Sequence, residues 1–174
     1  MSTIKTTNIS HGSNSGTANL VLASSGNVIL STTGYATTPN APYAMVGIDA
    51  ATAIANTTDT LLNWTTAIVN RNSFFDASNE RFTAPVAGEY LACFDVQFSG
   101  QVNQLHTGIF KNGTNPHAQF SAWCNHGDDT RGNSRSAIIN LAVNDYIDFH
   151  IYHGTGSSQN LEAGRTKASV RVLG

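Results

Sequence analysis

Residues 73–91 have the sequence SFFDASNERFTAPVAGEYL and decide the fold of this chain. Ala84-Pro85 is predicted to form a rigid corner, because proline fixes its own φ and keeps the residue before it out of the helical region. An aromatic-rich strand begins after that corner, at Gly88. Its large apolar side chains recur at every second position, which predicts one buried face: Tyr90, Ala92, Phe94, Val96 and Phe98.

Similar short runs follow along the chain. Asn112-Gly113 is a strong hairpin signal, because both residue types tolerate positive φ. Further strands are expected over residues 118–124, 135–143, 146–152 and 168–173. No convincing amphipathic helix is found. Many short strands at regular spacing predict an all-β fold, an antiparallel sandwich or barrel.

The composition fits one domain with a short appendage. The chain has 174 residues, of which 40% are hydrophobic, enough for a core. Only 11% are charged and the net charge is -2, so neither nucleic acid nor a membrane is expected as a partner. Composition changes near Tyr43, which predicts an N-terminal attachment arm with linker over residues 1–42 and the main domain over residues 43–174.

The pattern Phe-x-Ala-Pro-x-Ala-Gly-x-Tyr over residues 82–90 closely resembles the signature of the C1q/TNF-like globular head. Lys111-Asn112-Gly113 and the run Leu-x-x-Asn-Asp-Tyr-Ile over residues 141–147 also look like this family. The resemblance implies two packed sheets in a jelly roll, assembled as a homotrimer. The last strand, 168–172, departs from the Phe-Ser-Gly-Phe-like end of many members, and no Gly-X-Y collagen stalk is present.

The alternating run 146–152 supplies a candidate trimer interface. Ile147, Phe149 and Ile151 fall on one face, and the other face is the candidate for the threefold axis: Tyr146, Asp148, His150 and Tyr152. The alternative for that second face is an outer sheet surface in contact with solvent.

The arm contains two short β-prone runs around a Ser-Gly-Asn turn, within residues 18–31. An isolated hairpin is marginal in water, so its apolar residues need a covering surface. They are the candidates for attachment to a major capsid protein or another virion protein: Leu20, Leu22, Val28 and Leu30.

No catalytic group is expected, because no Gly-x-Ser-x-Gly elbow, paired carboxylates or phosphate loop is found. The six histidines do not have zinc-ligand spacing, and no cofactor is expected. Asp128 and Asp129 are candidate calcium ligands, and the alternative is that they lie in a solvated loop. Cys93 and Cys124 are expected to be buried free thiols, with a disulfide as the alternative.

These observations favour a non-enzymatic structural protein of a bacteriophage virion. The expected role is a homotrimeric capsid decoration or cement protein, similar to a head fibre, held by its N-terminal arm. With no secretory signal in the first residues, we expect synthesis in the bacterial cytoplasm and a place on the virion surface. The alternative is a receptor- or glycan-binding tip of a tail fibre, or a small adhesin, with Trp123, Asn125 and Gln119 as ligand candidates. For Trp123 itself, a core or interface position is the favoured interpretation.

Overall fold

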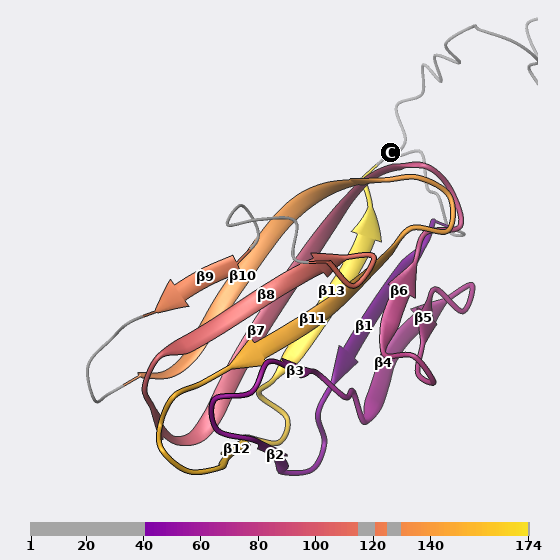
Figure 1. The fold of residues 1–174 in the computed structure, drawn as a ribbon. Coiled ribbons are helices and arrows are strands. Elements are labelled where there is room, and N and C mark those ends of the chain that lie inside the picture. Colours follow the sequence, from indigo (N-terminus) through magenta and orange to yellow (C-terminus); the bar gives the residue numbers. More distant parts are fainter. Residues whose placement is uncertain (1–40, 115–120, 125–129, 174) are drawn as a thin grey trace, which may run out of the picture. The chain divides into compact units, whose positions relative to one another are not determined.

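The computed structural model describes residues 41–114, 121–124 and 130–173, which form strands joined by turns (Figure 1). Of residues 121–124 and 130 only the backbone is described. In chain order the strands are β1 (Tyr43–Gly47), β2 (Thr52–Ile54), β3 (Thr60–Leu61), β4 (Thr66–Arg71), β5 (Phe75–Asp76), β6 (Arg81–Thr83), β7 (Gly88–Val102), β8 (Leu105–Lys111), β9 (Ser121–Cys124), β10 (Thr130–Leu141), β11 (Tyr146–Tyr152), β12 (Gln159–Leu161) and β13 (Lys167–Val172).

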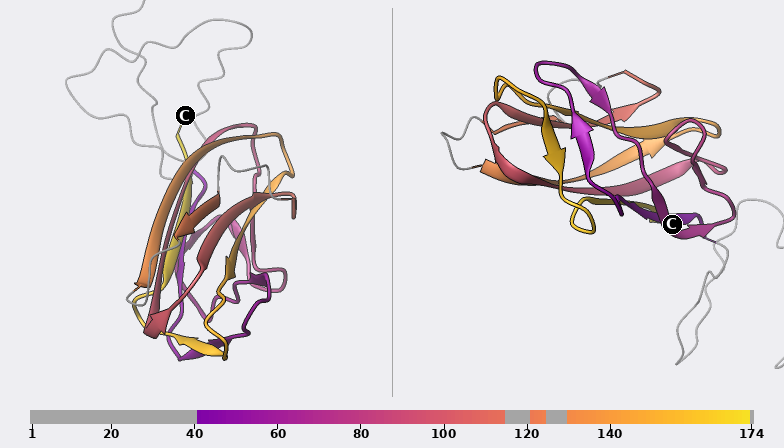
Figure 2. Two further views of the ribbon diagram at one scale, coloured as in Figure 1. Left: turned by 60° about the vertical axis from the view of Figure 1, so that its left-hand side comes forward. Right: turned by 90° about the horizontal axis from the view of Figure 1, so that it is seen from below.

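The strands form two antiparallel sheets. In the larger sheet the order is β2-β12-β7-β13-β1-β4, with β10 paired to the other side of β7, so that β13 lies between β7 and β1. In the smaller sheet the order is β5-β6-β11-β8-β9, with β3 paired to β11. Figure 2 shows the two sheets as facing layers. The predicted all-β fold class, an antiparallel jelly-roll sandwich, is confirmed.

The core lies between the layers, and the alternation read from the sequence describes it well. All five side chains predicted to be buried on β7 are at most 2% exposed, as are Ile147, Phe149 and Ile151 of β11. Phe149 is the centre of an aromatic cluster: its ring centroid lies 5.0 Å from that of Phe94, 5.7 Å from Phe82 and 5.9 Å from Trp64. Aromatic contacts therefore link strands of both sheets.

The Ala-Pro corner joins three segments. The Tyr90 hydroxyl donates a 2.7 Å hydrogen bond to the carbonyl of Val86 across the corner. The backbone of Ala84 exchanges two hydrogen bonds with the loop between β10 and β11, to the carbonyl of Asp145 and from the amide of Asn144. Hydrogen bonds therefore fix this corner to the start of β7 and to the loop between β10 and β11.

Strand boundaries differ modestly from those predicted. β10 begins five residues before the predicted strand 135–143, at a register shift where it pairs with β7. Gly132 follows the shift, and a Cβ there would collide with the carbonyl oxygen of Val96. The strand predicted over 118–124 is found as Ser121–Cys124, with 118–120 outside the described residues. The last strand is found one residue earlier than predicted.

The Asn112-Gly113 turn follows β8 as predicted. Both residues have positive φ, 54° and 67°, as a tight primed turn requires. The backbones of Lys111 and Thr114 hydrogen-bond to each other in both directions and close the turn.

Candidate functional surfaces

The outer face of the larger sheet carries apolar side chains in rows that cross the strands. Ile138 of β10 lies opposite Leu91 of β7, which lies opposite Arg171 of β13. Cys93 and Met45 follow in the adjacent row, on either side of β13. Ile138 is 57% exposed, the most among the large hydrophobic residues that the structure describes. The sheet therefore presents an apolar surface, which we call the Ile138 face.

The Ile138 face continues onto β4 and is hollowed in two places. Ile68 of β4 is 47% exposed and lies over Gly47 of β1, the strand that pairs with β13. Two open hollows of about 470 Å³ and 590 Å³ lie on the face and share Cys93 and Ser169 in their linings. Arg71 and Arg171 border the second hollow, and Asp95 and Lys167 border the first. The face combines exposed apolar groups with charges of both signs.

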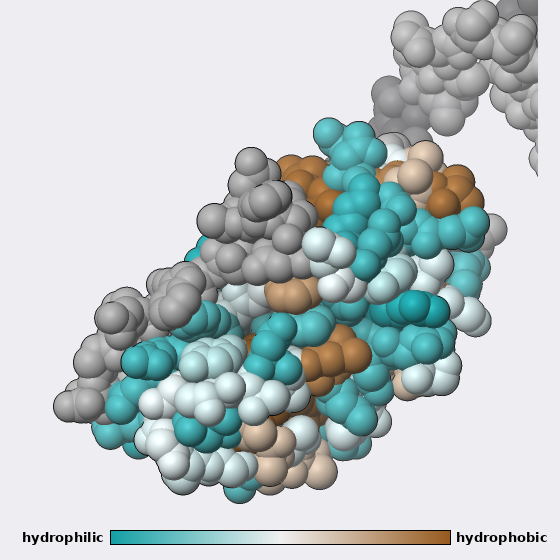
Figure 3. Space-filling model, viewed as in Figure 1, coloured by the Kyte–Doolittle hydropathy of each residue, from teal (hydrophilic) through white to brown (hydrophobic). Residues whose placement is uncertain are grey.

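The outer face of the smaller sheet brings together Tyr146, Asp148, His150 and Tyr152, as the alternation of β11 predicts. Each ring among them already has a partner inside the domain. Arg81 lies 4.7 Å from the ring centre of Tyr146, His150 stacks on Phe110 at 4.0 Å, and Tyr152 packs against His106 at 4.9 Å. Figure 3, viewed with the smaller sheet in front, shows mainly hydrophilic residues with hydrophobic ones in separate spots.

Asp148 is the unusual residue of this second face, because it is only 6% exposed. Burial raises the pKa of its carboxyl group above the ordinary value, and the neighbouring His150 acts in the opposite direction. Its Oδ1 has no hydrogen-bond partner among the described residues. Leaving a carboxylate oxygen buried and unpaired costs free energy.

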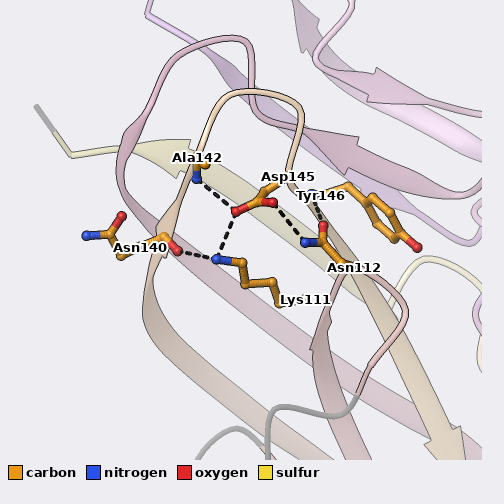
Figure 4. Close-up of polar contacts among 6 residues, drawn as sticks. All are labelled: Lys111, Asn112, Asn140, Ala142, Asp145 and Tyr146. Atoms are coloured by element: carbon orange, nitrogen blue, oxygen red, sulfur yellow. Dashed lines mark hydrogen bonds and ion pairs between the residues drawn. The ribbon is translucent and has the colours of Figure 1, made fainter.

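Asp145 is the centre of a polar cluster where β8 ends and β11 begins (Figure 4). Its carboxylate accepts hydrogen bonds of 2.8 Å from the Asn112 amide and the Ala142 backbone, and pairs with Lys111 Nζ at 2.8 Å. The Asn112 amide oxygen in turn accepts the backbone N–H of Tyr146. The two family-like motifs, residues 111–113 and 141–147, therefore meet in one cluster.

Acid should weaken the domain through Asp145. Hydrogen bonds from Lys111 and Asn112 hold its pKa at about 2, below the ordinary value of about 4. A carboxyl with a lowered pKa stabilises the fold above its unfolded-state pKa, and this contribution is lost as pH falls from about 4 to about 2. The Asp145→Asn variant should melt at a lower temperature than wild type at pH 7, and the difference should shrink by pH 2.

Melting curves recorded from pH 7 to pH 2 measure this difference. The control is Glu162→Gln, which removes only an exposed ion pair with Arg165 and should leave the difference from wild type small at every pH. A gap between Asp145→Asn and wild type that is as large at pH 2 as at pH 7 would contradict the assignment.

Several candidate residues lie outside the described part of the chain. They are the arm residues Leu20, Leu22, Val28 and Leu30, the ligand candidates Gln119 and Asn125, and the calcium candidates Asp128 and Asp129. Trp123 is on β9, with its backbone opposite His106. Their roles stay predictions.

The remaining candidates can be placed. Cys93 is a free thiol and is half-buried on the Ile138 face, rather than fully buried as predicted. Among the described residues, no three His, Cys, Asp or Glu side chains are grouped to hold a metal ion. The described residues also include no helix with the length and apolar character of a membrane span.

The sequence prediction missed the Ile138 face. A signal was present, because Ile138 and Ile139 are adjacent in a predicted strand and must point to opposite sides. Ile139 is 3% exposed and belongs to the core, which leaves Ile138 outside. Apolar residues on both faces of one predicted strand are thus the sequence signal for this face.

A family model described as the C1q domain matches residues 45–167, more than half of the chain. No curated protein sequence matches the chain.

Solved structures have the same fold at low sequence identity. The crystal structure of murine APRIL at pH 5.0 is similar with a TM-score of 0.56 and 15% identity, over 76% of this chain and 99% of that one. The globular domain of zebrafish complement 1qA protein gives 0.53 and 14%, over 77% and 98%. The Eiger TNF of S. frugiperda gives 0.53 and 10%, over 78% and 94%.

Proposed function

We propose that this chain, which belongs to the C1q domain family, is a non-enzymatic structural protein that assembles as a homotrimer. The observation that carries the proposal is the Ile138 face. Exposed isoleucines on a continuous sheet surface are costly for an isolated domain, and a neighbouring copy would remove them from water. The threefold symmetry comes from the family resemblance of residues 82–90.

A rotational assembly can bury this face with one repeated contact. In a closed ring, a patch on each copy meets a different patch on the next, so every copy contributes the same two surfaces. Charges of both signs border the hollows of the face: Arg71 and Arg171 around one, and Asp95 with Arg135 and Lys167 around the other. Such charges can pair between copies and fix the register.

The candidate interface at Tyr146, Asp148, His150 and Tyr152 stays a prediction. Its rings are engaged within the domain, so it offers less free apolar surface than the Ile138 face. The two faces lie on opposite sheets, and a single substitution on each distinguishes them.

We further propose that the trimer decorates a bacteriophage capsid as a cement protein, held by residues 1–42. The support is the composition of that segment, which is nearly free of charge and contains apolar β-prone runs that need a covering surface. A capsid protein could cover them by strand addition. The alternative is a receptor- or glycan-binding tip, or a small adhesin, for which Trp123, Asn125 and Gln119 are the candidates.

Two measurements test these proposals separately. Sedimentation of the purified full chain should give a mass three times the 18.4 kDa of one copy, and a monomer at micromolar concentration would contradict the trimer. Counting copies per purified particle then tests the location: hundreds of copies are expected for capsid decoration, and a handful would favour the fibre tip. A chain lacking residues 1–42 should stay trimeric but no longer bind particles.

A further inference from the structure

His150 lies between two carboxylates on the outer face of the smaller sheet. Its Nδ1 is 3.3 Å from the carboxylate oxygens of Asp59, and its Nε2 is 3.7 Å from Oδ1 of Asp148. Its ring is stacked on Phe110 with an angle of 6° between the planes. The imidazole is therefore held in one orientation, with each nitrogen directed at a different acid.

Gly108 helps to hold that orientation. It is the residue of β8 directly opposite His150, and a Cβ at this position would lie 2.5 Å from the Phe110 ring. The missing side chain leaves room for Phe110 to lie flat beside the imidazole. The arrangement depends on residues of β8 and β11 together.

The two acids belong to different parts of the fold. Asp148 is fixed within β11, whereas Asp59 is in the segment before β3, with a side chain that is 58% exposed. That segment is joined to β11 by the short β3 pairing and by the Leu62 amide, which donates to the carbonyl of Phe149; the Thr57 amide donates to the carbonyl of His153, the residue after β11. The side-chain oxygen of Asn56 also accepts a hydrogen bond from the Gly156 amide, and a contact at Asp59 would add to these bonds.

A neutral imidazole has one N–H and can donate to one of these acids only. An imidazolium has two, one toward each carboxylate, and its positive charge attracts both. Asp148 Oδ1 has no other hydrogen-bond partner among the described residues, so it gains most from the second N–H.

We propose that His150 is a proton-operated clasp, whose doubly protonated ring bridges Asp148 and Asp59 and fastens the segment before β3 onto β11. Histidine side chains gain their charge between about pH 5 and 8. The clasp closes when the ring takes up its second proton and opens when that proton is lost. It is independent of the proposed trimer, since it uses residues of one copy.

Other titratable groups surround the clasp. The positive charge of Arg81 on β6 acts on Asp148 and disfavours a second positive charge on His150. The two negative charges of Asp59 and Asp148 favour it. Burial lowers the pKa of His106 on β8, and the negative charge of Asp59 acts in the opposite direction. Tyr146 and Tyr152 flank His150 on the same face of β11. His153 is buried behind the same segment and contacts the carbonyl of Ile54.

Protonation of Asp148 determines the lowest pH at which the clasp holds. Because burial raises its pKa, it takes up a proton at a higher pH than an exposed aspartate does. A protonated Asp148 no longer attracts His150, so the fastening weakens again in more acidic solution. The segment should be held most firmly in mildly acidic solution.

Amide hydrogen exchange of the full chain tests the clasp. The protection factors of Leu62 and Thr57, corrected for intrinsic exchange, should be roughly three- to tenfold higher at pH 6 than at pH 8, as expected for two ion pairs of modest strength, one of them to the exposed Asp59. His150→Gln keeps a polar side chain that cannot take up a proton. In this variant the protection factors at pH 6 and pH 8 should be equal. His106→Gln is the matched control and should keep the wild-type ratio.

Asp59→Asn gives a second variant at an exposed position, where folding is not at risk, and should lower the ratio. Equal protection at pH 6 and pH 8 in wild type would overturn the proposal. So would a ratio that persists in His150→Gln, since the effect of pH would then not depend on His150. A ratio unchanged in Asp59→Asn would also overturn it.

Discussion

Replacing Phe149 with alanine should lower the free energy of unfolding by about 3–5 kcal/mol, as for other buried phenylalanines. The side chain is fully buried, and its ring contacts Trp64, Phe82 and Phe94. Its removal would leave a cavity between the two sheets, where backbone pairing prevents collapse. Since small domains are stable by only about 5–15 kcal/mol, a large fraction of the variant should be unfolded near 37 °C.

Urea denaturation followed by tryptophan fluorescence measures this effect. Phe110→Ala is the matched control, because it makes the same chemical change on the outer face of the same sheet, where the ring is only half-buried. It should cost less than half as much. Equal losses at the two positions would show that the cluster around Phe149 is not the main support of the sandwich.

Ile138→Asp should convert the trimer to monomers and lower the native mass threefold. Three copies of the substitution would each place an unpaired carboxylate in a buried contact, which costs several kcal/mol at each site. The monomer should still fold, because the Ile138 side chain is 57% exposed within it. Circular dichroism should therefore be unchanged while sedimentation changes.

Tyr152→Asp is the counterpart on the smaller sheet. If the Ile138 face is the subunit contact, this variant should stay trimeric. The reverse pattern, with a trimeric Ile138→Asp and a monomeric Tyr152→Asp, would assign the threefold axis to Tyr146, Asp148, His150 and Tyr152 instead. Each outcome supports one face and contradicts the other.

The sequence predicts the strands of the core well, because burial imposes a period of two on a strand. Tyr90 to Phe98 and Ile147 to Ile151 are correct to the residue. The corner at Ala84-Pro85 is also correct, since proline geometry is local. The strand order could be taken only from the family resemblance, because pairing between distant strands leaves no local pattern.

The candidate sites were harder to predict for the same reason. The alternation of β11 correctly puts Asp148 and His150 on one face, but Asp59 comes from the segment before β3 and Phe110 from β8, and that pattern does not include them. The cluster at Asp145 joins residues 111–112 to 140–146, and both motifs were recognised while their contact was not. Ile138 was missed because neither face of the predicted strand 135–143 was assigned.

The position of β13 has a consequence for how the protein is made. This strand, Lys167–Val172, lies between β7 and β1, so β1 has no partner on that side until β13 is in place. The nascent chain cannot complete the sheet before residues 167–172 have left the ribosome. Contacts so distant in sequence form slowly. During that delay the apolar sides of β1 and β7 are open to aggregation, and chaperones are expected to bind them.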